Sequence, residues 1–383
     1  MPDFHLRGIT WSHRRAIDPL TGTLDRFHAQ HPEIAIEWMA RPLHGFEFTP
    51  VLDLAKEYDL IVLDHPFVGE IAAAECLLPL DELLGAADRA AFVGPSLATY
   101  RFAGRLWAVP IDAACQTAVS RPDLLSRLDQ TPPEIWSEVI DLGRMAVRDG
   151  YHLAIGLRGV HSLMTFFSLC ANLGSPCSVE PGSSLVDRET ARISLALLRE
   201  LLSLCPEQVL DWNSIDLHDA MVARDDLIFC PAVYCYATYA EPDQRRPLRF
   251  HDLPGPRGCR GSTIGGTGLG ISASCKSPEA AKSYVRFAAS VPAQLAFASN
   301  HGQPARSAVW ENAAINERFG NCYSATRDTI EQSWIRPRYA GYLDFQAKAG
   351  TLIEQHLRGA VSEADLLERL EALHRQSGKS PTQ

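Results

Sequence analysis

The first third of the chain alternates between strand-forming and helix-forming patterns, and this alternation limits the fold more than any other feature. A strand pattern over residues 4–10 is followed by helical spacing over 20–31, which Pro32 ends. Residues 34–38 are a second strand pattern, and residues 60–63 form an uninterrupted apolar run typical of buried parallel strands. Strands that alternate with helices predict an α/β fold with a parallel sheet.

Polar and aromatic side chains follow two of these predicted strands. Trp11, His13 and Arg14 come after the first strand, and Asp64 and His65 come after the apolar run. Ligands of open α/β sheets bind beyond the carboxyl ends of the strands. We therefore expect these five residues at one edge of the sheet, where Arg14 or His13 binds an anionic group and Asp64 accepts a hydrogen bond from a hydroxyl.

The cationic run His13–Arg15 has a second interpretation. It is also typical of a solvated turn, in which Arg15 faces water. The sequence by itself leaves both interpretations open.

Length and charge restrict the class of protein. A chain of 383 residues is too long for one typical core and suits two domains. Its composition, 46% hydrophobic and 21% charged, is that of a soluble globular protein, and no apolar run approaches the roughly 20 residues of a membrane helix. The net charge of −10 is spread along the chain. Nucleic-acid-binding proteins display clustered lysine and arginine instead, so we expect no nucleic-acid partner.

The amino terminus and the cysteines bear on localisation. The chain begins Met1-Pro2-Asp3 and enters its first predicted strand without the regions of a secretory signal. Its ten cysteines are scattered, and no Cys-x-x-Cys pair or Cys/His block indicates a metal site. We expect free thiols, no metal and no cofactor. The sequence as written predicts a cytoplasmic protein, whereas a native start further upstream would make it periplasmic.

A set of segments in a fixed order resembles the type 1 extracellular solute-binding proteins. The resemblance covers nearly the whole chain and rests on the order of its segments. The matching segments are residues 31–34, 58–64, 77–84, 100–110, 120–125, 132–139, 265–272, 278–289 and 301–305, followed by the closing helices after Trp334.

The resemblance implies a fold and a function. The expected fold is α/β and two-lobed, of the periplasmic-binding-protein type II class, with a ligand cleft between the lobes. Lobe 1 is expected to hold residues 1–112 and 262–310, and lobe 2 residues 113–261 and 311–383. The stretch 241–261, rich in proline, glycine and arginine, is expected to carry the chain back between the lobes. The implied function is capture of a small polar ligand, such as a sugar or sugar acid, by lobe closure, for the membrane subunit of an ABC importer. We expect a monomer.

The resemblance also adds candidate ligand-binding residues to those at the strand ends. Aromatic faces stack on sugar rings, although a tyrosine-rich strand in the core explains the tyrosines equally well. A glycine-rich turn lets the backbone approach the ligand or the hinge. The added residues are Asp112, Tyr234, Tyr236, Gly266, Trp334 and Arg336.

The alternative to a transport protein is a cytoplasmic enzyme or ligand sensor on the same fold, because a fold does not determine function. Cys115, His65 and Asp112 supply a nucleophile, a base and an orienting group on paper, but their spacing does not require a catalytic set. The glycines of residues 268–273 match a loose dinucleotide-binding pattern that fails to open a helix. We therefore predict binding without catalytic residues.

Overall fold

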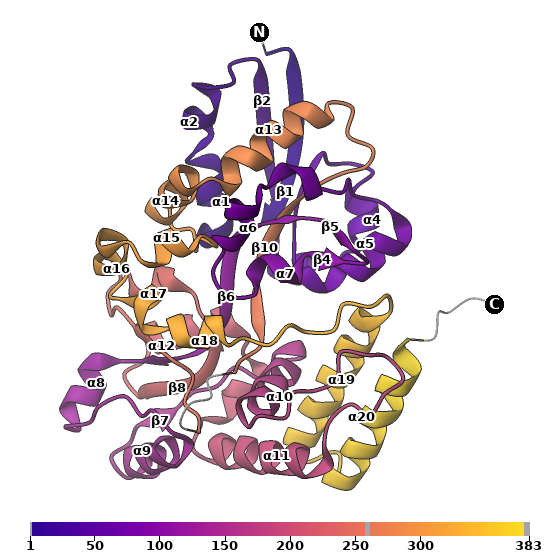
Figure 1. Ribbon diagram of the computed structural model, residues 1–383. Coiled ribbons are helices and arrows are strands. Elements are labelled where there is room, and N and C mark those ends of the chain that lie inside the picture. The colour runs from indigo at the N-terminus through magenta and orange to yellow at the C-terminus, as the bar shows by residue number, and fades with distance from the viewer. Residues whose placement is uncertain (1, 257–260, 379–383) are drawn as a thin grey trace. The chain divides into compact units, whose positions relative to one another are not determined.

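The computed structural model describes residues 2–256 and 261–378, and its chain forms two compact units (Figure 1). Unit 1 consists of Met1–Ala114, Gly265–Ile315 and Arg338–Ala340, and unit 2 of Cys115–Ile264, Asn316–Pro337 and Gly341–Gln383. The boundaries expected from the sequence lie at residues 112, 261 and 310. Cys259 and the last five residues of the tail lie outside the described residues.

Two strands belong to both units. The chain passes from unit 1 to unit 2 within β6 (Val109–Ser120) and returns within β10 (Ile264–Ile271). Residues 241–261 were expected to carry the chain between the lobes. For the residues of this stretch that the structure describes, 241–256 and 261, this expectation is wrong. Strand β9 (Arg249–His251) pairs with the unit 2 end of β6 and holds this stretch within unit 2.

Unit 1 is built on a sheet in the order β2 (Ile34–Arg41), β1 (Phe4–Trp11), β3 (Leu60–Leu63), β10. Strand β1 is parallel to both neighbours, as the alternating pattern predicts. Strand β10, which lies between β3 and β6, is antiparallel to β3, so the sheet is mixed and the prediction of a parallel sheet fails at this pair of strands.

Helices cover the sheet of unit 1. Helix α13 (Pro278–Ala289) packs Tyr284 against Phe27 of α2 (Leu24–His28) and Trp38 of β2. The other elements of this unit are α3 (Leu43–Phe48), α4 (Val51–Leu54), η1 (His65–Phe67), α5 (Val68–Ala74), η2 (Asp81–Leu83), α6 (Ala86–Ala90), α7 (Ser96–Thr99), β4 (Arg101–Phe102), β5 (Arg105–Leu106), α14 (Val291–Ser299) and α15 (Ser307–Trp310), with α16 (Ala313–Arg318) at its boundary.

The helix expected over residues 20–31 is instead two helices, α1 (Arg14–Thr21) and α2. Helix α1 begins at Arg14 because the His13 side chain caps it and accepts a hydrogen bond from Arg15 N. It ends at Gly22, where a Cβ atom would lie 2.4 Å from Asn300 Oδ1. The run His13–Arg15 thus caps and begins a helix.

Unit 2 contains the remaining strands of the sheet. The unit 2 end of β6 is antiparallel to β8 (Leu227–Tyr234), which is parallel to β7 (His152–Leu153). Around them lie α8 (Pro122–Arg127), α9 (Trp136–Arg148), α10 (Val160–Asn172), α11 (Arg188–Ser203), η3 (Glu207–Asp211), α12 (Ser214–Ala223), η4 (Ala237–Ala240), α17 (Cys322–Ala325), α18 (Arg327–Glu331), α19 (Tyr342–Leu357) and α20 (Glu363–Ser377).

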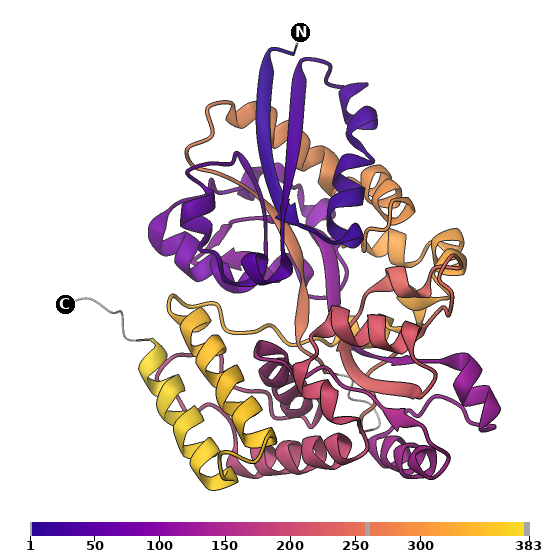
Figure 2. The same cartoon turned by 180° about the vertical axis from the view of Figure 1, so that it is seen from behind.

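Helix α10 is central to this unit and almost entirely buried. Helix α19 packs against it and α20 packs against α19, which Figure 2 shows from behind. These two helices are the closing helices expected after Trp334. No helix in the described part of the chain is long and apolar enough to cross a membrane.

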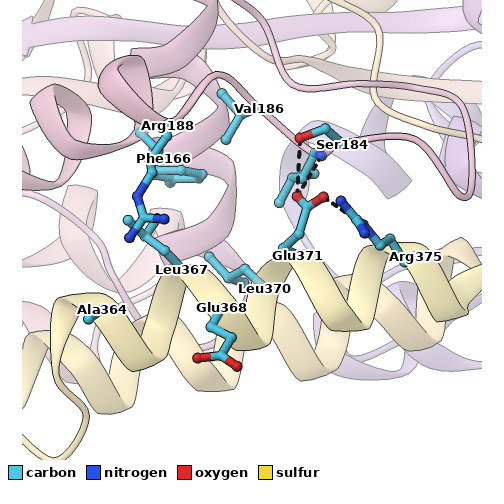
Figure 3. A pocket seen from close by; sticks show the side chains of 12 residues that line it. Phe166, Ser184, Val186, Arg188, Ala364, Leu367, Glu368, Leu370, Glu371 and Arg375 are labelled. Carbon is cyan, nitrogen blue, oxygen red and sulfur yellow. Dashed lines mark hydrogen bonds and ion pairs between the residues drawn. The ribbon is translucent and has the colours of Figure 1, made fainter.

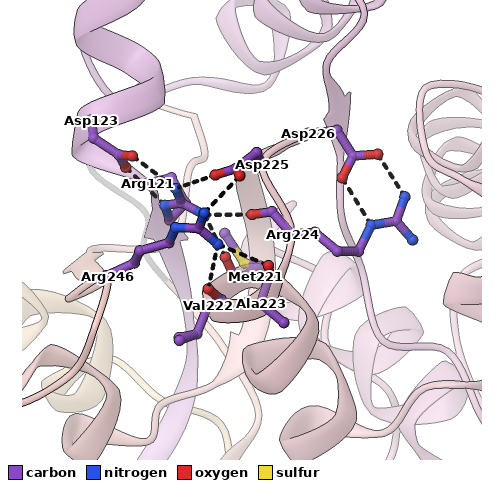
Figure 4. A network of polar contacts seen from close by, with 9 residues as sticks. All are labelled: Arg121, Asp123, Met221, Val222, Ala223, Arg224, Asp225, Asp226 and Arg246. Carbon is purple, nitrogen blue, oxygen red and sulfur yellow. Dashed lines mark hydrogen bonds and ion pairs between the residues drawn. The ribbon is translucent and has the colours of Figure 1, made fainter.

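A buried arginine joins β6 to α12 in unit 2 (Figure 4). The guanidinium of Arg121, at 0% exposure, donates to both carboxylate oxygens of Asp123 at 2.8 and 2.7 Å. It also donates to the carbonyl oxygens of Met221 at 2.7 Å and Arg224 at 2.6 Å, which lie at the end of α12. Helix ends leave carbonyl groups without intrahelical partners, and a cation satisfies them well.

We expect Arg121→Ala to lower the free energy of unfolding by about 3 kcal/mol, because it removes a buried cation that satisfies a carboxylate and two carbonyl groups. Chemical denaturation followed by circular dichroism measures the change. The control is Arg144→Ala, which removes an exposed ion pair with Glu200. It should cost less than about 1 kcal/mol, and equal losses in the two variants would contradict the assignment.

Candidate functional site

The two predicted strand ends of unit 1 lie at one edge of its sheet. Strand β1 ends at Trp11 and its parallel neighbour β3 ends at Leu63, so Asp64 and His65 follow at the same edge. Trp11 is 4% exposed and its ring lies against Phe46, with the ring centroids 4.8 Å apart.

Asp112 binds Arg15 at this edge. The Nε atom of Arg15 donates to Oδ2 at 2.7 Å and a terminal nitrogen donates to Oδ1 at 2.5 Å. Arg15 and Asp112 are 5% and 6% exposed, so the second interpretation of the run His13–Arg15, a solvated turn in which Arg15 faces water, is wrong. Burial raises the pKa of Asp112, while Arg15 lowers it and Asp64 raises it further. Both oxygens of Asp112 are thus engaged inside the protein, and its predicted contact with a ligand remains a prediction.

His13 and Arg14 are half-buried beside this pair. Burial and the neighbouring Arg15 and Arg14 lower the pKa of His13 to about 4, so its imidazole is neutral at pH 7. A terminal nitrogen of Arg14 lies 2.8 Å from each ring nitrogen of His301. Of these two residues Arg14 is therefore the cation at pH 7, and its predicted contact with an anionic ligand group remains a prediction.

Asp64 and His65 differ in exposure. The Asp64 side chain is 22% exposed and the His65 side chain is 0% exposed. Oxygen Oδ1 of Asp64 accepts from His65 N at 2.8 Å and lies 3.1 Å from its Nδ1. Asp64 thus reaches solvent and can accept from a ligand, whereas His65 lies inside the protein.

Two residues that line a narrow cavity near the strand ends carry a buried polar atom each. Trp11, Arg15, Asp112, Thr267 and Gln303 are among the residues that line it. Neither Trp11 Nε1 nor Thr267 Oγ1 has a hydrogen-bond partner among the described residues. Buried polar groups normally have partners, so this cavity suits a water molecule or a ligand hydroxyl.

Gly266 has a structural reason to be glycine. Its φ is +99°, and a Cβ atom there would lie 2.4 Å from the carbonyl oxygen of Asp112. The missing side chain lets β10 approach the backbone of β6 within unit 1. Its role in ligand binding remains a prediction.

Two tyrosines of unit 2, Tyr236 and Tyr239, lie in an aromatic cluster around His218. Tyr234 ends β8 and is half-buried. Tyr236 is 6% exposed, and its ring centroid lies 5.7 Å from that of His218, which stacks on Tyr239 at 4.9 Å. Tyr239 donates to Asp219 Oδ1 at 2.7 Å, and burial with this contact raises its pKa. Tyr239 is thus a core residue, and of the two candidate tyrosines Tyr234 is the more exposed.

Trp334 and Arg336 lie in one segment of unit 2. Trp334 is half-buried; its backbone pairs with Ser262 and Ile264, and its ring meets Phe167 edge-on at 5.3 Å. Arg336 is 5% exposed and donates to Gln346 Oε1 at 3.1 Å.

Arg338, only two residues further along, belongs to unit 1 and donates to the carbonyl oxygens of Ala98, Thr99 and Arg101 at 2.7 to 2.9 Å. These hydrogen bonds hold Arg338 against the backbone of residues 98–101.

The structure adds His161 of α10, which the sequence did not single out. Its Nδ1 lies 3.3 Å from Ser214 Oγ, and Arg158, Asp216 and Arg336 lie close enough to shift its titration. Burial and Arg158 lower the pKa of His161 to about 4. Gly159 precedes α10 and has a φ of +56°. This glycine was the feature of the sequence that could have indicated where the helix begins.

The candidate residues are separate from a pocket of about 460 Å³ in unit 2 (Figure 3). Phe166 of α10, Arg188 of α11 and Leu367 of α20 line it, and Glu371 holds its wall by accepting from Leu185 N at 2.9 Å. None of the predicted ligand residues lines it. In the described ranges, no group of three or more His, Cys, Asp and Glu side chains is arranged to hold a metal ion.

We expect His161 to make folding sensitive to acid. Its pKa is about 4 in the folded chain against an ordinary 6.5, so between these values only the unfolded chain binds the proton. The free energy of unfolding should therefore fall as the pH drops through this window, by up to about 2 kcal/mol between about pH 7 and about pH 5 from this residue.

Denaturation at both pH values should show a flatter pH dependence in His161→Gln. The exposed His5 provides the control variant His5→Gln, which should keep the wild-type slope. Identical slopes in wild type and His161→Gln would contradict the assignment.

Comparisons with known proteins concern the fold. A scan of protein-family models and a search of curated proteins give no match. Solved structures match over nearly the whole chain. Maltose-bound MalE3 of T. maritima superposes with a TM-score of 0.82 at 22% identity and covers 96% of this chain and 98% of that one.

Two further structures are ABC transporter solute-binding proteins. The protein of Thermotoga lettingae TMO, bound with α-D-tagatose, has a TM-score of 0.85 at 14% identity and covers 98% and 100% of the two chains. The protein of Agrobacterium radiobacter K84, in complex with ribitol, has a TM-score of 0.79 at 16% identity and covers 98% and 100%. The chain therefore has the α/β, two-lobed fold of solute-binding proteins, and the predicted fold is confirmed.

Proposed function

We propose that this protein is a solute-binding protein that captures a small polar solute, a sugar or polyol, through contacts from both units and supplies an ABC importer. The observation that carries the proposal is the match, over nearly the whole chain, to structures whose bound ligands are maltose, tagatose and ribitol. Such ligands offer hydroxyl groups and an apolar ring or chain face.

The residues of unit 1 suit a hydroxylated ligand. The partly exposed carboxylate of Asp64 accepts hydrogen bonds from hydroxyl groups, and Trp11 Nε1 and Thr267 Oγ1 are buried polar atoms beside a cavity. Arg14 favours a ligand with an acidic group, such as a sugar acid. Unit 2 contributes Tyr234, whose ring can stack on a sugar, together with Tyr236, Trp334 and Arg336.

The binding mechanism we propose is closure. A ligand that contacts both units favours the closed arrangement over the open one, and its differential affinity shifts the equilibrium between them. An importer subunit that recognises the closed form would then receive only the loaded protein. Delivery to an importer places the protein outside the cytoplasmic membrane, and cell fractionation tests this location.

Catalysis by Cys115 is disfavoured by its surroundings. Burial raises the pKa of this thiol well above its usual range, with Cys235 adding to the effect. The thiolate is the nucleophilic form, so a thiol held protonated at neutral pH is a poor nucleophile. Product analysis after incubation with a bound sugar tests this directly, and turnover would favour the enzyme alternative.

Replacing Asp64 by Ala should cost about 1 to 3 kcal/mol of affinity, because a hydroxyl of the ligand loses its acceptor in a site shielded from water. Calorimetry with maltose, tagatose and ribitol as probes measures the loss for whichever binds. Asp64 also caps η1, so circular dichroism must first show an intact fold. The control is Asp53→Ala, an exposed carboxylate paired with Lys56 in the same unit. A loss below about 0.5 kcal/mol for Asp64→Ala would remove this residue from the site.

Closure should be visible in solution. At a hundredfold excess of ligand over its dissociation constant, binding should stabilise the fold by about 2.7 kcal/mol. Small-angle scattering should show a smaller radius of gyration at the same saturation. A preformed pocket gives the stabilisation without compaction, so an unchanged radius would reject closure and leave the fold untouched.

A further inference from the structure

Two thiols of unit 2 meet in its interior. The Sγ atoms of Cys235 and Cys322 lie 3.3 Å apart, although the two residues are 87 positions apart in the chain. Cys235 follows β8 and is 3% exposed, and Cys322 begins α17 and is 0% exposed. This pair belongs to none of the contacts assigned to the solute.

The backbone at both cysteines is held in place. Cys235 N donates to Cys115 O at 3.1 Å, which continues the pairing of β8 with β6. Cys322 N donates to Phe319 O at 3.0 Å, and its carbonyl oxygen accepts from Thr326 Oγ1 at 2.8 Å. Helix α17 also packs against β9 and η4 within the unit. A disulfide places its sulfur atoms about 2 Å apart, so the two Sγ atoms must come closer by roughly 1 Å to reach bonding distance.

We propose that Cys235 and Cys322 are a modification site at which a small peroxide oxidant forms a reversible disulfide. The sulfur of Cys235 attacks one oxygen of hydrogen peroxide, the O–O bond breaks, and the displaced oxygen leaves as water with the thiol proton of Cys235. The sulfur of Cys322 then displaces the hydroxyl group of the resulting sulfenic acid, and a second water leaves with its proton. The two thiols lose two electrons and the peroxide gains them.

The position of the pair gives the bond a structural consequence. Cys235 lies in the stretch Cys115–Ile264 of unit 2, and Cys322 lies in the stretch Asn316–Pro337. The chain connects these stretches only through unit 1, because Gly265–Ile315 lies between them. A covalent bond joins them directly and restrains the segment from Tyr234 to Tyr236. The bond is independent of the proposed function, since its formation needs no solute.

The long separation favours a measurable effect on stability. A cross-link restricts the unfolded chain, and the restriction grows with the number of residues in the closed loop. The oxidised protein should therefore unfold at a midpoint several degrees above the reduced protein.

Peptide mapping tests the bond. The native protein is treated with hydrogen peroxide, unfolded without reductant in the presence of iodoacetamide, and digested with trypsin. Trypsin releases Cys235 in residues 225–245, together with Cys230, and Cys322 in residues 319–327. We expect these two peptides to be linked, with fragmentation placing the bond at Cys235, and dithiothreitol to separate them. Absence of the linked pair, or a bond from Cys235 to Cys115, overturns the proposal.

Variants provide the control. Cys322→Ser should lose both the linked peptides and the rise in unfolding midpoint after oxidation. Cys205→Ser removes a half-buried thiol that donates to Leu201 O, and it should keep both. If Cys322→Ser does not fold, wild-type protein with and without dithiothreitol still decides the question. Equal midpoints for the mapped oxidised and reduced forms would overturn the structural consequence.

Discussion

The two strands that belong to both units, β6 and β10, are the constraint on which the rest of the structure depends. Gly266 makes their approach within unit 1 possible, because a Cβ atom there would overlap with the backbone of Asp112. Its φ of +99° is also strained for any residue with a side chain. A substitution at Gly266 would therefore act first on the path of the two strands, and only through them on the residues that the strands carry.

The ion pair of Arg15 and Asp112 sets the electrostatics of the sheet edge in unit 1. Burying two charges is costly, and two short hydrogen bonds between them offset the cost. The pair also separates the functions of adjacent residues: Arg15 holds α1 to the start of β6, whereas Arg14 contacts His301 and remains half-buried. Asp64, the acid of this edge whose side chain is 22% exposed, remains the predicted acceptor for the proposed solute.

Elements with strong local signals were predicted accurately from the sequence. The apolar run of residues 60–63 is β3, and the family-like segment 278–289 is helix α13 with the same bounds. The helix expected over 20–31 is interrupted, because α1 ends at Thr21 and α2 begins at Leu24. The stretch 241–261 was misplaced because its pairing with β6 is a contact between distant residues.

The sequence by itself determined the α/β class, the two-domain scale and the strand ends at which candidate residues lie, because periodicity and strand direction are local properties. Only the tertiary structure decided what each polar side chain does there. Arg336 and Arg338 have the same chemistry two positions apart, yet one contacts Gln346 in unit 2 and the other caps carbonyl groups in unit 1. Arg15 contacts Asp112, which is 97 positions away in the chain, and His161 contacts Ser214, which is 53 positions away. Burial and hydrogen-bond partners of this kind depend on contacts that no local pattern encodes.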